Sequence, residues 1–157
     1  MSISKNVPRG NVLLGTFSNM LDPWFVTGFC DSTATFTYSK AGGTFNLYFS
    51  LRQSENNREI VEKIQRFFGQ IGSIYISKGK QSQKQRATYY YRISRVKQLR
   101  RVVEHFDSYP LQSKKQNVYV IWRKMVMHKI DNFRDIDSAM LKDLAGKLTI
   151  FNQKNNG

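Results

Sequence analysis

Residues 44–52 alternate between apolar and polar side chains along the chain. The apolar positions are Phe45, Leu47, Phe49 and Leu51. A period of two is typical of a strand with one buried face, because successive side chains of a strand point to opposite sides. The segment KAGG just before it supplies turn glycines, so residues 35–52 are predicted to form a β-hairpin. A second hairpin is predicted from GSIYIS and ATYYYRIS, which the polar turn KGKQSQKQR joins.

Apolar residues at helical spacing surround and separate the two hairpins. Asp22 offers an N-cap and Pro23 the first position of a short helix. Gly69 ends the next helix, and Ser94 is the expected cap of the third. The predicted helices cover residues 24–31, 56–68, 95–107, 111–130 and 136–151.

These five helices and four strands follow the order αββαββααα. This order indicates an α+β domain in which helices cover one face of an antiparallel four-stranded sheet and leave the other face to solvent or a ligand. We expect residues 1–20 to be an N-terminal arm, residues 21–152 a single domain, and residues 153–157 a C-terminal tail.

The composition adds a strong basic charge to this picture. The 157 residues include 25 Lys and Arg against 11 Asp and Glu, a formal net charge of +14. Such a charge repels itself unless an anionic partner lies against it, and the usual partners are nucleic acid or an anionic membrane. No apolar run is as long as a membrane span, and the charge is spread over several segments. Nucleic acid is therefore the expected partner and a membrane is not.

Cysteine and histidine are scarce. Cys30 is the only cysteine, and His105 and His128 are the only histidines. An internal disulfide and a zinc site are therefore excluded, and a reducing compartment is indicated. No cofactor is expected.

The cations and polar side chains of the two hairpins predict a nucleic-acid-binding surface. Cations position a phosphate backbone, whereas short polar side chains and aromatic rings meet base edges and base faces. The alternative is an ordinary solvated basic surface. Tyr89 and Tyr91 share a face with Ile93 and are expected in the core. The predicted binding residues are Thr35, Thr37, Ser39, Asn46, Tyr48, Ser50, Arg52, Lys78, Lys80, Lys84, Arg86, Tyr90, Arg92, Lys114 and Lys115.

Four segments together resemble the LAGLIDADG homing endonucleases of fungal and algal organelles. LDPWFVTGFCDSTATF is similar to the motif itself, and REIVEKIQRFFGQIGSIYI to the helix and strand that follow it. VVEHFDSYPLQSKKQNVYVIWRKMV is similar to the Tyr-Pro-Leu turn and basic helix start of the family, and LKDLAGKLTIFN to its closing helix. The resemblance covers most of residues 21–152 and implies the αββαββα fold that the pattern also predicts.

The resemblance implies a paired architecture. In the family, two motif helices pack together and the last turn of each presents a carboxylate that holds a divalent metal for phosphodiester hydrolysis. This chain carries one motif, so a homodimer or a partner chain is implied. Gly28 and Ser32 are small residues four apart, and they form the predicted face for helix pairing. The alternative is that Gly28 packs under its own sheet.

The motif departs from the family where the metal would be held. The position of the acid is Thr33, and a neutral hydroxyl is a poor ligand for a hard divalent cation. Asp31 is about 200° away around the helix, so it is expected to point elsewhere and to be structural. Ala34 replaces the following glycine, and Ser50 stands where the family commonly has Gln. Lys115 matches the basic residue of the family near the scissile phosphate.

Two functions remain open. The first is a LAGLIDADG-fold protein without nuclease activity that binds structured RNA, as a maturase or as part of an organellar ribonucleoprotein such as the mitochondrial ribosome, with rRNA and ribosomal proteins as partners. The second is an active endonuclease that cleaves double-stranded DNA as a homodimer, and only this second function requires Mg²⁺. The resemblance implies a mitochondrial or other organellar location.

Overall fold

The computed structural model describes residues 20–79 and 86–155. None of the helices in these two ranges is both long and apolar enough to cross a membrane. The elements along the chain are α2 (Pro23–Thr33), β1 (Ala34–Ala41), β2 (Thr44–Ser54), the 3-10 helix η1 (Glu55–Asn57), α3 (Arg58–Phe67), β3 (Ser73–Ser77), β4 (Thr88–Ile93), α4 (Val96–Ser108), α5 (Lys115–Asp131) and α6 (Ser138–Asn155).

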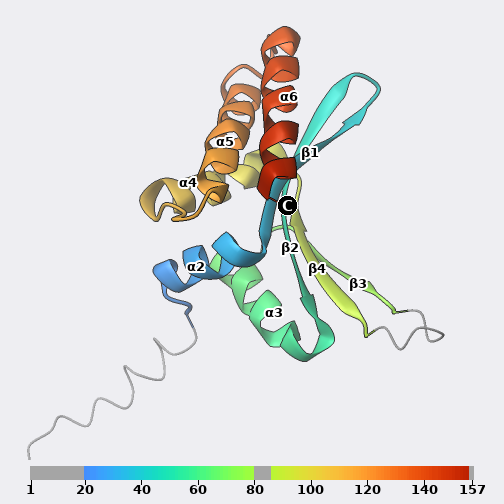
Figure 1. The fold of residues 1–157 in the computed structure, drawn as a ribbon, viewed down its shortest axis with the longest axis vertical. Helices are drawn as coiled ribbons and strands as arrows, with labels where there is room; N and C mark the ends of the chain where they lie inside the picture. The colour runs from blue at the N-terminus through green and yellow to red at the C-terminus, as the bar shows by residue number, and fades with distance from the viewer. Residues whose placement is uncertain (1–19, 80–85, 156–157) are drawn as a thin grey trace, which may run out of the picture.

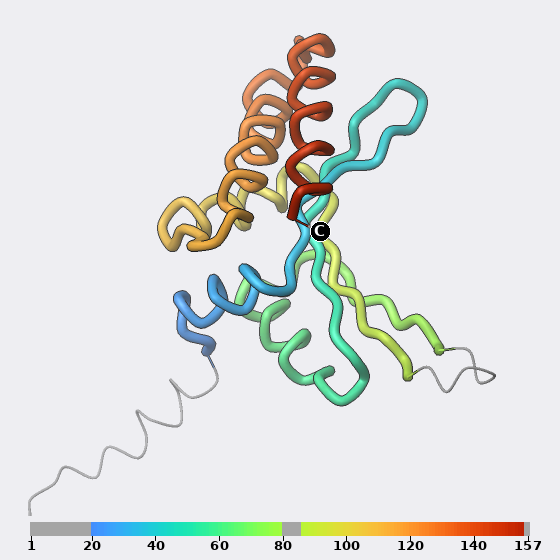
Figure 2. The backbone as a smooth tube through the Cα atoms, viewed as in Figure 1, coloured from blue at the N-terminus to red at the C-terminus, as the bar shows by residue number. Residues whose placement is uncertain are grey.

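The four strands form one antiparallel sheet in the order β1-β2-β4-β3 (Figure 1). The two hairpins therefore meet through β2 and β4, and β1 and β3 are the sheet edges. α5 and α6 run side by side, and the β1–β2 hairpin extends next to α6 (Figure 2). The predicted α+β fold class and element order are confirmed.

One face of the sheet carries the core. The predicted apolar row of β2 is buried, with Leu47 and Phe49 fully enclosed, and Tyr89 and Tyr91 of β4 are buried on the same side. Phe36 of β1 lies at the centre, and its ring contacts rings from β2, α4 and α5: Phe49, Phe106, Tyr119 and Trp122. α4 and α5 therefore cover the same face of the sheet.

The predicted start of α5 at Leu111 is wrong, and α2 supplies the physical reason. The Asp31 carboxylate accepts the backbone N–H groups of Gln112 (2.8 Å) and Ser113 (3.0 Å), which holds this segment outside the helix. The Ser113 hydroxyl then accepts the N–H of Lys115 (3.1 Å), where α5 begins. The loop is therefore ordered by a residue more than eighty positions earlier.

Two further boundaries differ from the prediction. Ser94 is not the cap of α4, because the N–H groups of Gln98 and Leu99 donate to the backbone carbonyl of Arg95. α6 begins at Ser138, where the Asp137 carboxylate accepts the N–H of Met140 (2.9 Å). The helix then continues past residue 151 to Asn155, into the segment predicted to be a tail.

Candidate functional site

The motif helix α2 is built as its sequence predicts at the N-terminus. The Asp22 carboxylate accepts the N–H groups of Trp24 (2.8 Å) and Phe25 (3.3 Å), and Pro23 occupies the first turn. These bonds satisfy two N–H groups that a helix start leaves without partners. α2 ends at Thr33 and leads directly into β1.

Thr33, at the position of the family's acid, uses its hydroxyl within its own helix. The hydroxyl donates to the backbone carbonyl of Phe29 at 2.7 Å, and Ser32 donates to the same oxygen at 3.0 Å. A threonine hydroxyl has one proton to donate, and its remaining lone pairs carry no formal charge. Thr33 therefore offers no anionic ligand at the end of α2.

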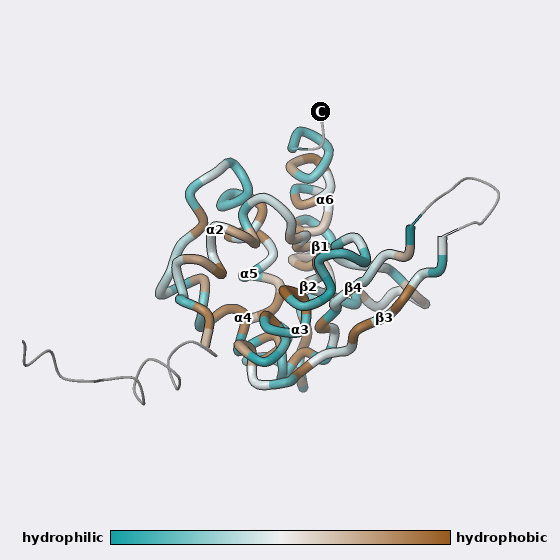
Figure 3. Tube along the Cα trace, turned by 90° about the horizontal axis from the view of Figure 1, so that it is seen from below, coloured by the Kyte–Doolittle hydropathy of each residue, from teal (hydrophilic) through white to brown (hydrophobic). Residues whose placement is uncertain are grey.

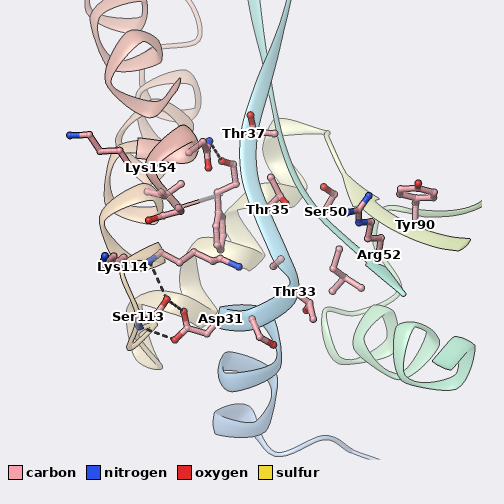
Figure 4. A pocket seen from close by; sticks show the side chains of 18 residues that line it. Asp31, Thr33, Thr35, Thr37, Ser50, Arg52, Tyr90, Ser113, Lys114 and Lys154 are labelled. Atoms are coloured by element: carbon pink, nitrogen blue, oxygen red, sulfur yellow. Dashed lines mark hydrogen bonds between the residues drawn. The ribbon is translucent and has the colours of Figure 1, made fainter. Parts of the chain in front are cut away.

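Asp31 is the carboxylate in this turn, and its two oxygens are already engaged. Besides the two N–H groups that precede α5, it accepts the Ser113 hydroxyl. Figure 4 shows its side chain directed toward Ser113, whereas Thr33 lies on the side of Ser50 and Arg52. Asp31 therefore connects α2 to the start of α5.

Lys115 is a half-buried cation beside this turn. Its ammonium donates to the backbone carbonyl of Cys30 at 3.2 Å. Burial lowers the pKa of Lys115, while the neighbouring Asp31 carboxylate acts in the opposite direction. Burial also raises the pKa of the Cys30 thiol to about 12, so this cysteine stays a neutral thiol at neutral pH.

A hollow of about 1110 Å³ surrounds these side chains. Hydroxyl groups and cations predominate in its lining, and Asp31 is the only acid among the lining residues. β1 crosses it, with α5 and α6 on one side and β2 and β4 on the other (Figure 4). Its polar lining residues from the sheet and helix starts are Thr33, Thr35, Thr37, Ser50, Arg52, Tyr90, Ser113, Lys114 and Lys115.

The sequence analysis missed three residues of this hollow, all near the end of α6. They are Asn152, Lys154 and Asn155. The Asn152 amide donates to the backbone carbonyl of Phe36 at 3.1 Å, which fixes the end of α6 against β1. The sequence has no helix breaker directly after Phe151, and this could have indicated that the last helix continues to these residues.

These residues do not fit a divalent metal. Thr33 carries no charge, and the oxygens of Asp31 are held by donors from the loop before α5. In the described part of the chain no three His, Cys, Asp or Glu side chains gather where they could hold a metal ion. A hard cation such as Mg²⁺ needs carboxylate oxygens that are free to coordinate it.

The open face of the sheet brings most of the predicted binding residues together. Thr35 pairs with Ser50, which pairs with Arg92, so these side chains lie in one row across three strands. Arg52 pairs with Tyr90 in the next row. Thr37 pairs with Tyr48 and Ser39 with Asn46 in the rows toward the β1–β2 turn.

Aromatic rings add a second kind of contact to this face. The Arg92 guanidinium lies 3.8 Å from the centre of the Tyr48 ring. Tyr75 pairs with Tyr90 across β3 and β4, and its side chain is 57% exposed. Tyr75 was missed because β3 is a short apolar segment whose alternation is weak.

Two of the predicted cations of the second hairpin are not part of the lining of the hollow. Lys78 and Arg86 are exposed beyond the ends of β3 and β4, on the part of the hairpin that projects away from α5 and α6 (Figure 1). Lys80 and Lys84 lie outside the described residues.

The predicted pairing face of α2 is exposed. A Cβ atom placed on Gly28 would have no neighbour within 4 Å, so Gly28 does not pack under its own sheet. Ser32 is also exposed, and Trp24 and Phe25 are 53% and 48% exposed. Large apolar side chains are uncommon on a free surface when several gather. α2 therefore presents an apolar face, with a glycine at its centre, that residues 20–79 and 86–155 leave uncovered.

Comparison with known proteins decides the family. The model of the LAGLIDADG endonuclease family matches residues 26–126. The chain belongs to this family. Two solved LAGLIDADG meganucleases, I-CpaMI and I-AabMI, both bound to uncleaved DNA, share 27% and 26% of aligned residues with it, at TM-scores of 0.66 and 0.67. Each comparison covers 79% of this chain, and 41% and 42% of the meganuclease.

Two curated fungal proteins are also similar to this LAGLIDADG chain. The "Probable intron-encoded endonuclease 2" of Neurospora crassa is 30% identical over 71% of the chain, and a 50.9 kDa protein in ND4 intron 1 of Podospora anserina is 29% identical over 68%. The chain spans about a quarter of the length of each, 25% of the Neurospora protein and 24% of the Podospora protein.

Proposed function

We propose that this LAGLIDADG domain binds nucleic acid and supplies no catalytic carboxylate of its own. Thr33 carries the proposal, because its hydroxyl is bound to the Phe29 carbonyl and nothing anionic replaces the missing acid. The open face of the sheet and the cationic hollow offer the contacts for a phosphate backbone and for bases.

We further propose structured RNA as the ligand, in an organellar ribonucleoprotein such as the mitochondrial ribosome or as a maturase. Exposed cations continue from the open face into the second hairpin, as an irregular RNA surface would require. Relatives named as fungal intron proteins support a mitochondrial origin.

DNA cleavage is the second candidate, and the exposed α2 face favours it. DNA-bound relatives are more than twice as long as the matched segment, so a second LAGLIDADG unit could cover Gly28 and its apolar neighbours. In a homodimer both units would carry Thr33, so cleavage would need a carboxylate from a different chain. Mg²⁺ belongs only to this candidate.

A cleavage assay tests the first proposal. The purified chain is incubated with a plasmid library and Mg²⁺ or Mn²⁺, and we expect no site-specific break. A double-strand break that Lys115→Ala abolishes would overturn the proposal, because Lys115 lies in the hollow beside the motif.

A binding assay tests the ligand. We define an open-face variant with Arg52→Gln, Arg92→Gln and Lys114→Gln, three exposed cations of the sheet and hollow. We define a paired-cation control with Arg58→Gln, Lys63→Gln and Lys147→Gln, which removes the same charge from cations bound to carboxylates. For an RNA stem–loop, we expect the slope of log affinity against log salt to fall by roughly 2 to 3 in the first variant only.

The same assay with a DNA duplex separates the two ligands. Tighter binding of the stem–loop than of a duplex of equal length supports RNA. Tighter binding of the duplex at every salt concentration would refute the RNA proposal, and equal slopes for both variants would leave the open face as a solvated surface.

A further inference from the structure

Helix α4 carries an outward stripe of cations on the helix-covered side of the molecule. Leu99, Val102 and Phe106 face the core, and the stripe lies opposite to them. Lys97, Arg100 and Arg101 are three and four residues apart, so they share one side of the helix, and Arg95 lies just before its first turn. The cations are Arg95, Lys97, Arg100 and Arg101, all exposed. Together they define the α4 stripe.

The α4 stripe lies on the opposite surface from the open face of the sheet. Phe106 of α4 packs against Phe36 and Phe49, which point from the sheet into the core. α4 lies beside α3 and α5 on this side of the strands (Figure 3). One sheet layer and one helix, roughly 20 Å of protein, therefore separate the two basic surfaces.

On the other helices some outward cations pair with carboxylates, while Arg66, Lys124 and Lys142 form no ion pair among the described residues. α4 differs in that three exposed cations lie close together on one side of the helix. Arg58 pairs with Glu62 at 2.6 Å, Lys63 with Glu59 at 2.7 Å, and Lys147 with Asp143 at 2.9 Å. On α5, Arg123 pairs with Asp107 at 2.7 Å.

Within the described residues, Lys97 and Arg100 form no ion pair, and Arg101 reaches Glu104 only at 3.7 Å. The Arg101 charge also acts on its own helix, because it disfavours a proton on His105. It is the second cause, after burial, of the lowered pKa of His105. Cations gathered without partners destabilise the free protein, so an anion in this place would stabilise it.

The chemistry of the α4 stripe selects the kind of anion. A protein interface usually has an apolar centre, and a membrane-binding helix has an exposed apolar face. The apolar residues of α4 are enclosed in the core, and its outward side offers charge and little else. Arginine guanidinium groups match phosphate geometry in particular.

We propose that the α4 stripe is a second nucleic-acid-binding surface, which contacts the phosphate backbone of an RNA segment separate from the one on the open face. The proposal rests on the proposed function only in taking RNA as the ligand. A straight duplex on the sheet does not reach α4, so the domain would join two segments of a folded RNA.

The test compares three variants on one labelled RNA stem–loop over a series of potassium chloride concentrations. The α4 variant carries Lys97→Gln, Arg100→Gln and Arg101→Gln, and the open-face variant and the paired-cation control are those defined above. Each removes three charges at positions outside the core, so all three variants should fold.

We expect the α4 variant to lower the salt slope by roughly 2 to 3, since each phosphate contact contributes about 0.7 to 0.9. The paired-cation control should lower it by less than one contact. Arg100→Lys with Arg101→Lys keeps the charge, so it should retain the wild-type slope. In a variant with both surfaces neutralised, the salt slope should fall by the sum of the two separate reductions, because the surfaces bind separate RNA segments.

Five outcomes would overturn the inference. Equal salt slopes for the α4 variant and the paired-cation control would show that the stripe contributes only to the net charge and makes no specific phosphate contact. If the RNA slope is unchanged and polyglutamate binds wild type but not the α4 variant, the stripe binds an acidic protein instead. The same result with phosphatidylserine vesicles would assign the stripe to a membrane. A chain that does not bind the RNA at all would remove both proposals. An open-face effect without an α4 effect would leave the proposed function intact and reject the second surface.

Discussion

His105 gives the clearest quantitative prediction, because it is a buried histidine whose surroundings are fully described. Its side chain is 8% exposed, between the rings of Phe67, Phe68, Phe106 and Tyr109. Thr27 donates its hydroxyl proton to the Tyr109 carbonyl at 2.8 Å. The Thr27 oxygen, 3.1 Å from Nε2 of His105, must therefore accept a proton from that nitrogen. When His105 is neutral, its single ring proton therefore lies on Nε2.

The pKa of this histidine fixes the sign of the pH dependence. Burial, with Arg101 second, lowers the pKa of His105 from 6.5 to about 4 in the folded protein. Between these values the unfolded chain binds a proton and the folded chain does not. The free energy of unfolding therefore falls as the pH falls, by about 1.4 kcal/mol per pH unit. Across the window from pH 6.5 to about 4 the loss is on the order of 3 kcal/mol, and it is absent above about pH 7.5.

The assay is urea unfolding, followed by circular dichroism, at steps from about pH 7.5 to about pH 4.5. His105→Gln is the matched variant, because its amide can still donate to Thr27 but does not titrate in this range. Wild type should lose stability relative to the variant as the pH falls, while the effects of the carboxylates cancel in the difference. A difference that stays constant across the pH range would refute a buried, neutral His105.

Further predictions concern the core, the motif and the pairing face. Phe49→Ala should lower the free energy of unfolding by about 3 to 5 kcal/mol, whereas Asn46→Ala should change it by less than about 0.5 kcal/mol, and equal losses in urea unfolding would show the register to be wrong. Asp31→Ala should cost about 1.5 to 3 kcal/mol through the loop before α5, measured against exposed Asp143→Ala. Gly28→Leu should leave the melting temperature of the monomer unchanged or raise it, because the site is open and leucine favours helix, and should split any dimer seen by sedimentation. A lower melting temperature at every concentration would show that Gly28 packs within its own chain.

The fold was predictable because its signals are local. Alternation in β2 and the glycines before it determine the first hairpin, and Asp22 with Pro23 determines the start of α2. The misplaced boundaries depend on contacts between distant residues. The start of α5 depends on Asp31, and no periodicity within residues 111–115 carries that information.

The site was predictable only in part, for a related reason. Strand alternation places Thr35, Ser50 and Arg92 on one face, but which of them share a row depends on the register between strands. Asn152 reaches the hollow because α6 returns to β1, a contact between residues far apart in sequence. The α4 stripe required both the packing of α4 and the ion pairs of the other helices.

The loss of the motif acid is compatible with a stable domain because the two acidic positions of the motif perform different tasks. Asp31 holds the loop before α5 and remains in place, so the connection between α2 and α5 does not depend on a metal. Thr33 instead satisfies its hydroxyl within α2, on the backbone carbonyl of Phe29. The residue at position 33 is therefore not needed for this connection, whereas loss of Asp31 would disorder the start of α5 and, with it, the position of Lys115.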